Sequence, residues 1–252
     1  MRRAVVRRPS RRIAEGEVTH IDRVPLDSAL GLRQHDNYLG VLRDLEVELL
    51  YAPETDDHPD GLFVEDALVM IDGHAIITRP GALSRRGETD SIRTLVRALD
   101  LPLSEITDGT LDGGDVLVVG DCVFIGLTTR TNQIAIDQLA GFAAPLGRRT
   151  IAVNVPGCLH LKSAITALPD NTLIGVEGWY DPTPFNDAGL VIHTALEPSG
   201  GDVLCVGSTV VLPSDAPRTG RFIAGLGFGV RYVDVSELQK IEAGVTCMSV
   251  LL

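Results

Sequence analysis

The sequence is poor in the patterns that mark several large classes of protein. Four of its 252 residues are cysteines, and their positions, 122, 158, 205 and 247, show no CxxC or CxxH spacing. This argues against a zinc site and a disulfide framework, so we expect reduced thiols. No apolar run is long enough to span a membrane, and the basic start MRRAVVRRPSRRIAEGE contains no apolar stretch fit for a signal peptide. The sequence therefore predicts a cytoplasmic protein with no membrane partner.

Positive charge is scarce as well. Lys and Arg together number 22 against 34 Asp and Glu, which gives a net charge of −12. A chain with this excess of negative charge suits nucleic acid poorly, and its field favours the approach of a cationic substrate. We therefore expect a small-molecule partner and no nucleic acid. The sequence does not decide the oligomeric state and leaves a homodimer open.

The chain does contain one local pattern that returns five times. A polar residue opens an apolar strand, and a Gly or Asn turn leads to a second apolar strand. The opening positions 66, 115, 162, 202 and 247 lie 49, 47, 40 and 45 residues apart, close to a single period. Since 44% of the residues are apolar and no segment resembles a linker, we expect one domain of cyclic repeats over residues 1–252.

Each period also predicts a helix and a third strand, which is the order of a ββαβ unit. Helices are expected over 29–45, 91–99, 131–147 and 219–227, whereas the turn-rich third period, GWYDPTPFNDAG, offers no convincing helix. The fifth period ends after one strand, and the N-terminal AVVRRP completes it if the two pair. The predicted fold is then α/β, a five-fold pseudosymmetric propeller of ββαβ modules closed by its terminal strands. A doubly wound sheet is the alternative, but it predicts no such recurrence.

In such a ring the opening residues of the repeats converge on the axis. Cys247 occupies the position that carries Asp66 and Asp115 in earlier repeats, and His160 opens the third repeat. A lone cysteine in an apolar strand is usually inert, but a cysteine and a histidine in one pocket can form a nucleophile and its proton-transfer partner. Carboxylates beside them fit a guanidinium, a planar cation whose forked donors match carboxylate oxygens.

Six segments together resemble one known family, the dimethylarginine dimethylaminohydrolases of the guanidine-modifying superfamily of five-fold α/β propellers. In family order they are HPDGLFVED (58–66), AIITRPGALSRRGE (75–88), TLDGGDVLVVG (110–120), GLTTRTN (126–132), LHLKSA (159–164) and GVTCMSVLL (244–252). The resemblance implies hydrolysis of Nω-methylated L-arginine to L-citrulline and methylamine or dimethylamine through a covalent cysteine intermediate. It also implies that no metal and no organic cofactor takes part.

The resemblance further implies catalytic roles for three residues. The nucleophile falls on Cys247 in the TCMS segment, and the general acid and base falls on His160 in LHLKS. The acid that supports the histidine and the guanidine falls on Asp112 of LDGGD, where some members have Glu.

Five substrate contacts follow from the same matches. Asp66 matches the carboxylate that binds the guanidinium, with Asp60 and Glu65 as nearby contacts. Arg85 and Arg130 match the two arginines that hold the substrate carboxylate. The plainer alternatives are a turn residue for Asp60 and a structural salt bridge for either arginine.

Two further contacts are Val18, in the lid that precedes the first helix in the family, and Ile241, near the C-terminus. Counting back without a gap from RQH puts the substrate-facing residue at Val18, in the segment EGEVTHIDRVPLDS, which matches poorly. Ile241 takes the position whose backbone faces the substrate amino group, and Glu242 follows it where Asp is more usual.

Two other functions stay open. An arginine deiminase-type hydrolase would use the same groups on unmethylated arginine, although such enzymes usually carry an extra helical domain for which no sequence remains here. A non-catalytic propeller that acts as a binding module belongs to a different class. It would not need Cys247, His160, Asp66 and two carboxylate-binding arginines together.

Overall fold

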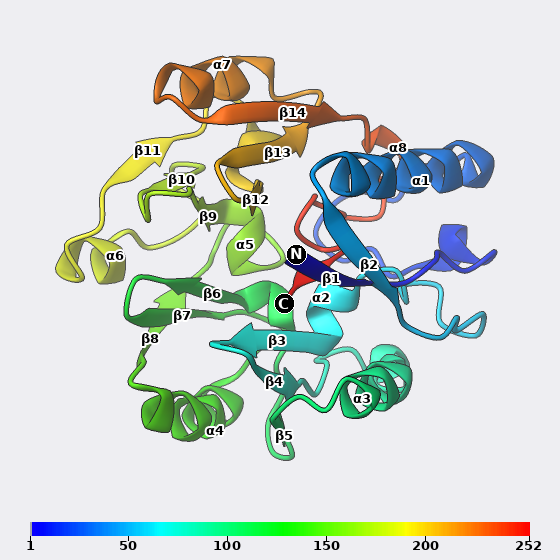
Figure 1. Ribbon diagram of the computed structural model, residues 1–252, viewed down its shortest axis with the longest axis horizontal. Helices are drawn as coiled ribbons and strands as arrows, with labels where there is room; N and C mark the ends of the chain where they lie inside the picture. Colours follow the sequence, from blue (N-terminus) through cyan, green and yellow to red (C-terminus); the bar gives the residue numbers. More distant parts are fainter. Residues whose placement is uncertain (1) are drawn as a thin grey trace.

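Over residues 2–252, which the computed structural model describes, fifteen strands form five small sheets around a common axis (Figure 1). In each sheet the first two strands pair antiparallel and the third lies parallel to the second. In spatial order the sheets are β15 (Val250–Leu251), β1 (Arg2–Val6), β2 (Val47–Tyr51); β3 (Leu68–Ile71), β4 (His74–Ile77), β5 (Leu103–Glu105); β6 (Val116–Val119), β7 (Cys122–Leu127), β8 (Arg149–Asn154); β9 (Ile165–Ala167), β10 (Leu173–Gly175), β11 (Ile192–Thr194); and β12 (Leu204–Val206), β13 (Thr209–Pro213), β14 (Gly229–Val233). The predicted five-fold α/β propeller of ββαβ modules is confirmed.

Helices join the second strand of each sheet to the third and lie on the outside of the ring (Figure 1). They are α1 (Ser28–Asp44), α3 (Glu88–Ala98), α4 (Gln133–Ala143), α6 (Thr183–Asp187) and α7 (Pro217–Gly225). The helix α6 is the one that the sequence did not predict, because five residues are too few for a periodic apolar pattern. Smaller helical elements are η1 (Ile13–Glu15), η2 (Leu83–Arg85), η4 (Ala144–Leu146) and α8 (Ser236–Gln239).

The terminal strands close the ring as predicted. Val5 of β1 lies opposite Val250 of β15 in antiparallel pairing, and the N–H of Leu252 donates to the carbonyl of Arg3 at 2.8 Å. The two ends of the chain therefore meet near the axis (Figure 1). This pairing also fixes the position of Cys247, because Cys247 lies only three residues before β15.

The repeat openings differ from the prediction in one respect. The sequence predicts that the polar residues begin the strands, but four of them lie in or beside a single helical turn that precedes the strand. These turns are α2 (Val64–Ala67), η3 (Gly113–Asp115), α5 (Leu161–Ala164) and η5 (Pro198–Gly201). The turns crowd together at the axis: a Cβ on Gly113 would lie 2.0 Å from the Glu65 carbonyl oxygen, and one on Gly114 would lie 2.7 Å from His160 Nδ1. Glycine is required there because two backbones and a side chain approach so closely.

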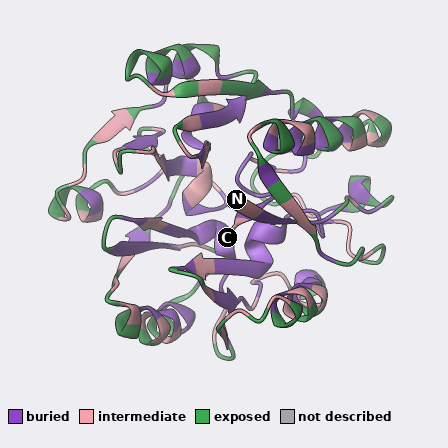
Figure 2. Cartoon of the chain, in the orientation of Figure 1, coloured by how far each residue is buried: buried purple, intermediate pink, exposed green. Residues whose placement is uncertain are grey.

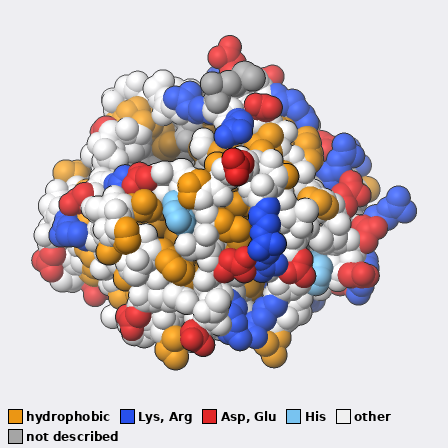
Figure 3. Space-filling model, turned by 60° about the horizontal axis from the view of Figure 1, so that its bottom comes forward, with side chains coloured by type: hydrophobic (Ala, Val, Ile, Leu, Met, Phe, Trp, Pro, Cys, Tyr) orange, Lys and Arg blue, Asp and Glu red, His pale blue; other side chains and the backbone are white. Residues whose placement is uncertain are grey.

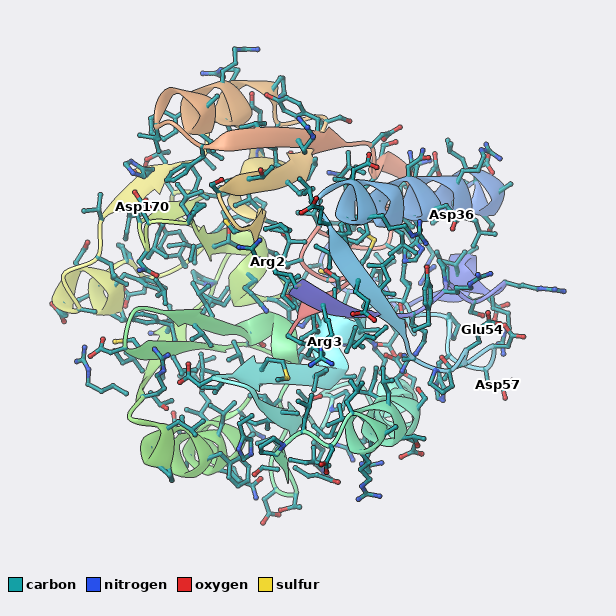
Figure 4. All side chains as sticks on the ribbon, viewed as in Figure 1. Arg2, Arg3, Asp36, Glu54, Asp57 and Asp170 are labelled. Carbon is teal, nitrogen blue, oxygen red and sulfur yellow. The ribbon has the colours of Figure 1, made fainter. Side chains whose placement is uncertain are left out.

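Apolar side chains pack between neighbouring sheets, and the outer helix faces remain exposed (Figure 2). Acidic and basic side chains are interspersed on the face in Figure 3. The side chains of Asp36, Glu54, Asp57 and Asp170 lie away from the axis, whereas Arg2 and Arg3 lie close to it (Figure 4). Across residues 2–252, the structure contains no helix with the length and apolar character that crossing a bilayer requires.

Candidate active site

A narrow cavity at the axis collects most of the predicted site residues. Its lining is Glu17, Asp60, Phe63, Asp66, Arg85, Arg130, Leu159, His160, Ile241, Glu242 and Cys247. Residues far apart in the sequence meet there because the openings of different repeats converge on the axis. Asp66 lies in α2, His160 directly precedes α5, and Cys247 precedes β15. Asp112 lies directly behind this lining, fully buried, whereas the side chains of Val18 and Glu65 lie elsewhere.

Cys247 presents a buried thiol to the cavity. The N–H of Gly244 donates to its Sγ at 3.3 Å, and its carbonyl accepts from the N–H of Glu65 at 3.2 Å. Burial, together with the charges of Asp202, Glu65 and Asp66, raises the thiol pKa well above its usual range. The sulfur is therefore protonated at neutral pH and needs an added positive charge to become a thiolate.

His160 lies between two carboxylates. Its Nε2 is 3.0 Å from Asp112 Oδ2, and its Nδ1 is 3.8 Å from Asp66 Oδ1. Burial alone would lower the imidazole pKa, but Asp66, the hydrogen bond to Asp112 and the charge of Asp115 outweigh it and raise the pKa to about 9. The imidazole therefore carries a proton at neutral pH and can give it away. Asp112 is fixed in turn, since its Oδ1 accepts the N–H of Gly81 at 2.8 Å.

Asp66 is a buried carboxylate that lines the cavity together with His160 and Cys247. Burial opposes its ionisation, but the charges of His160 and Arg85 lower its pKa below the usual range. Its Oδ2 accepts from Arg85 Nη1 at 2.7 Å, and its Oδ1 accepts the N–H of Gly114 at 3.2 Å. Asp66 is thus held as an anion facing the cavity.

The two predicted carboxylate-binding arginines lie in different surroundings. Arg85 is bound by Asp66 and by both oxygens of Glu88, at 3.0 and 2.9 Å, so it belongs to a buried salt-bridge network. Arg130 is bound less completely. Its Nη2 lies 3.4 Å from Glu17 Oε2, and its Nη1 lies 3.6 Å from Asp112 Oδ2 without a hydrogen bond to any described residue.

Residues 16–24 cover the cavity, and we call this segment the lid. Asp60 accepts the N–H of Glu17 at 3.0 Å, and Glu242 accepts those of Thr19 and Ile21 at 3.1 Å and that of His20. The side chain that reaches the cavity is that of Glu17. The side chain of Val18, at the position counted from the sequence, packs instead against a buried apolar cluster that includes Ile241.

Glu65 faces away from the reacting groups. Its Oε1 accepts from Lys162 Nζ at 2.6 Å and its Oε2 from the Thr246 hydroxyl at 2.9 Å. All three line a second cavity of about 270 Å³. Adjacent side chains of a helical turn point in different directions, and here the side chain of Asp66 faces the active-site cavity whereas that of Glu65 does not.

Three acidic residues near the site, the partly exposed Glu17 and the buried Glu88 and Asp202, lie outside the set predicted from the sequence. Glu17 had no signal, because the lid has no periodic pattern. Glu88 follows Arg85 by three residues, a spacing at which helical side chains meet. Asp202 stands at a repeat opening, and burial followed by the charge of Glu65 raises its pKa to about 7.

Among the described residues in and behind the cavity lining, one group has the spacing of a metal site. One side-chain atom each of Asp66, Asp112 and His160 lie within 4.8 Å of one another. The hydrogen bond of His160 to Asp112 and the charged imidazole favour an ion-pair network over a metal, because a ligating histidine is neutral. The absence of a cofactor stays a prediction.

Comparison with known proteins also indicates a guanidine-modifying enzyme. The family model for arginine deiminase matches residues 50–181. Among curated proteins, the N(G),N(G)-dimethylarginine dimethylaminohydrolase of Streptomyces coelicolor is 43% identical, over 100% of this chain and 97% of that protein. The enzyme of the same name from Pseudomonas aeruginosa is 34% identical, over 97% of each chain.

Solved structures of this kind superpose closely. A cysteine-to-serine variant of the Pseudomonas aeruginosa protein complexed with citrulline has a TM-score of 0.91 at 34% identity, covering 99% of this chain and 98% of that one. An adduct of a dimethylarginine dimethylaminohydrolase with S-methyl-L-thiocitrulline also has a TM-score of 0.91, at 33% identity and 99% coverage of both chains. Because similarity at this level runs over the whole chain, the protein belongs to the dimethylarginine dimethylaminohydrolase family.

Proposed function

We propose that this protein hydrolyses Nω-methylated L-arginine to L-citrulline and methylamine or dimethylamine through a covalent bond to Cys247. The observation that carries the proposal is the convergence of a thiol, a protonated imidazole and an ionised carboxylate on one narrow cavity. The relatives above, which bear the name of this activity or bind citrulline, add independent support. The cytoplasmic location stays a prediction, and the oligomeric state stays open.

Binding would place the guanidinium against Asp66, with its carbon facing the sulfur of Cys247. The cation supplies the positive charge that the thiol needs to ionise, because it is a new neighbour within a few ångströms of a buried sulfur. The thiol proton passes to solvent as the substrate binds, since the imidazole of His160 already carries one. Asp66 fixes the plane of the guanidinium through paired hydrogen bonds, and orientation of this kind contributes as much as charge. Substrate binding and activation of the nucleophile are therefore one event.

The first chemical step joins sulfur to the guanidinium carbon. The thiolate attacks, and His160 gives its proton to the departing nitrogen as the carbon–nitrogen bond breaks. Methylamine or dimethylamine leaves, and an amidino thioether remains on Cys247. Asp112, hydrogen-bonded to Nε2 of the imidazole, keeps the ring oriented through this transfer.

The second step uses the same imidazole in its neutral form. His160 takes a proton from water, the resulting oxygen attacks the same carbon, and the carbon–sulfur bond breaks. The electron pair returns to sulfur, and the released product is L-citrulline. No metal and no organic cofactor is needed for either step.

The test is citrulline formation by the purified protein with monomethylarginine, asymmetric dimethylarginine and arginine supplied in parallel. We expect turnover of one or both methylated substrates and none by Cys247→Ser. Turnover of arginine alone would favour the second candidate, a deiminase-type hydrolase, which the match of residues 50–181 to the arginine deiminase family brings forward. No turnover of any of the three would contradict both.

A further inference from the structure

We infer that the carboxylate of Glu17 occupies the Arg130 subsite of the cavity and competes there with the α-carboxylate of the substrate. This makes Glu17 a determinant of substrate selectivity. The inference rests on the proposed function to the extent that Arg130 is taken to receive the substrate carboxylate. Nothing in the sequence pattern had marked this residue.

The position of Glu17 is fixed from both ends. Its N–H donates to the two oxygens of Asp60 at 3.2 and 3.0 Å, and its Oε1 accepts from the Ser84 hydroxyl. Its Oε2 faces Arg130 Nη2 at 3.4 Å. The Glu17 side chain is 34% exposed, so it stands at the mouth of the cavity and can move outward.

Arg130 is the cation that an incoming anion would find. Its side chain is 7% exposed, and its Nη1 makes no hydrogen bond to any residue that the structure describes. In contrast, each guanidinium nitrogen of Arg85 already has a partner, with Glu88 and Asp66 as its anions. A substrate carboxylate would therefore seek Arg130, where it meets the carboxylate of Glu17.

Two carboxylates at one guanidinium repel each other unless one of them leaves. Substrates with an α-carboxylate must displace Glu17 from Arg130, and this lowers their affinity. A guanidine that keeps the α-amino group and lacks the carboxylate leaves the pair of Glu17 and Arg130 intact. For a partly exposed pair of this kind we expect an effect of about fivefold on affinity.

The first test compares the KM of Glu17→Gln with that of the native chain for two substrates, Nω-methyl-L-arginine and the same molecule with hydrogen in place of its carboxylate. Gln keeps the shape of Glu17 and its contact with Ser84 but removes the charge. We expect KM to fall about fivefold for the amino acid, with a smaller change in kcat, and to stay the same or rise for the amine. A KM that rises equally for both would overturn the inference, because Glu17 would then bind the amino group that they share.

A second measurement does not depend on turnover. Calorimetry on Cys247→Ser, with and without Glu17→Gln, measures the binding of L-citrulline, which retains the α-carboxylate. Tighter binding in the double variant supports the inference even if no methylated arginine is hydrolysed. Equal binding overturns it while the proposed hydrolysis can stand, and no binding to either variant overturns both. Glu15→Gln is the matched control, because Glu15 lies two residues away and pairs with Arg12.

Discussion

Asp202 is a buried acid close to Cys247, and the proposed chemistry gives it no role. Its Oδ1 accepts the N–H of Thr246 at 3.0 Å, and a Cβ on Gly244 would lie 1.6 Å from its Oδ2. The carboxylate thus supports the loop that carries Cys247. After burial, its charge is the largest cause of the raised thiol pKa. One residue therefore stabilises the loop and restrains the reactivity of the resting thiol.

Replacement of Asp202 by Asn should separate these two effects. Asn keeps an oxygen for Thr246 and removes the charge, so the pKa of the Cys247 thiol should fall. At pH 8.5, above the Asp202 pKa of about 7, we expect iodoacetamide to alkylate Cys247 up to about tenfold faster. Peptide mass spectrometry distinguishes this thiol from the other three. Asp187→Asn, on the exposed end of α6, should change nothing, and an unchanged rate in Asp202→Asn would contradict the argument.

The raised pKa of His160 should appear in the stability of the protein. A histidine pKa of about 9 in the folded state, against 6.5 in the unfolded chain, stabilises the fold fully below pH 6.5, and this contribution is lost as pH rises toward 9. The carboxyls of Asp115 and Asp202, with pKa values near 6 and 7, titrate mostly below pH 7.5. Between pH 7.5 and 9 the groups that change are therefore the imidazole and the four thiols, whose raised pKa values also lower the stability of the fold as the pH approaches 9.

Urea unfolding at a series of pH values measures this contribution. From pH 7.5 to 9 we expect the free energy of unfolding of the native chain to fall by about 2 kcal/mol more than that of His160→Gln, in which the thiols still contribute and the imidazole does not. The difference between the two chains removes the contributions of groups that they share. A fall of the same size in both would show that the imidazole is not the group responsible.

At the scale of elements, the lid is held by a carboxylate rather than by apolar packing alone. Glu242 accepts three successive backbone N–H groups, those of Thr19, His20 and Ile21. Its own φ is +64°, a left-handed conformation that costs a residue with a side chain about 1 kcal/mol. This strained residue is the one whose carboxylate binds the lid.

We expect Glu242→Ala to loosen the lid. The amides of Thr19, His20 and Ile21 should exchange hydrogen at least about tenfold faster, since three N–H groups lose their acceptor. The KM for the substrate should rise several-fold as the lid closes less often. Glu46→Ala is the control, because Glu46 also has a positive φ, of +60°, but is exposed and far from the lid in sequence. Faster exchange in both variants would point to backbone strain instead.

The positions of the repeat elements could be predicted from the sequence, whereas the conformation of the lid could not. Strand hairpins with alternating apolar residues recur at one period, so the ring and the convergence of Cys247, His160 and Asp66 followed from position alone. The one-turn helices carry no periodic signal, and this is why the sequence could not show that Glu65 points away from Asp66. In the lid, counting along the sequence gives Val18, whereas the side chain that reaches the cavity is that of Glu17, one residue earlier. Which of the two side chains faces the cavity depends on the packing of Val18 against the apolar cluster that includes Ile241, and no sequence pattern shows this packing.

At the scale of the whole molecule, the first sheet connects the beginning of the ring to its end. Val5 and Val250 pack with Leu68 and Ile77 of the second sheet. Ala4 and Val6, on the other face of β1, pack with Val211 of the fifth. The sheets are small and share these clusters with their neighbours, so we expect the ring to unfold as one unit.

A substitution at the closure tests this cooperativity. Val5 is fully buried opposite Val250, and Val5→Ala removes two methyl groups from their shared cluster, so we expect the free energy of unfolding to fall by about 2 kcal/mol. Circular dichroism reports on helices all around the ring, whereas alkylation of Cys247 reports on the closure. The two midpoints in urea should shift together, because opening the closure exposes apolar surface of both neighbouring sheets. Ile134→Ala, at a side chain that is 60% exposed on α4, should leave both midpoints in place. If Cys247 became reactive at lower urea than the loss of helix, the closure would be an independent gate rather than part of a single cooperative ring.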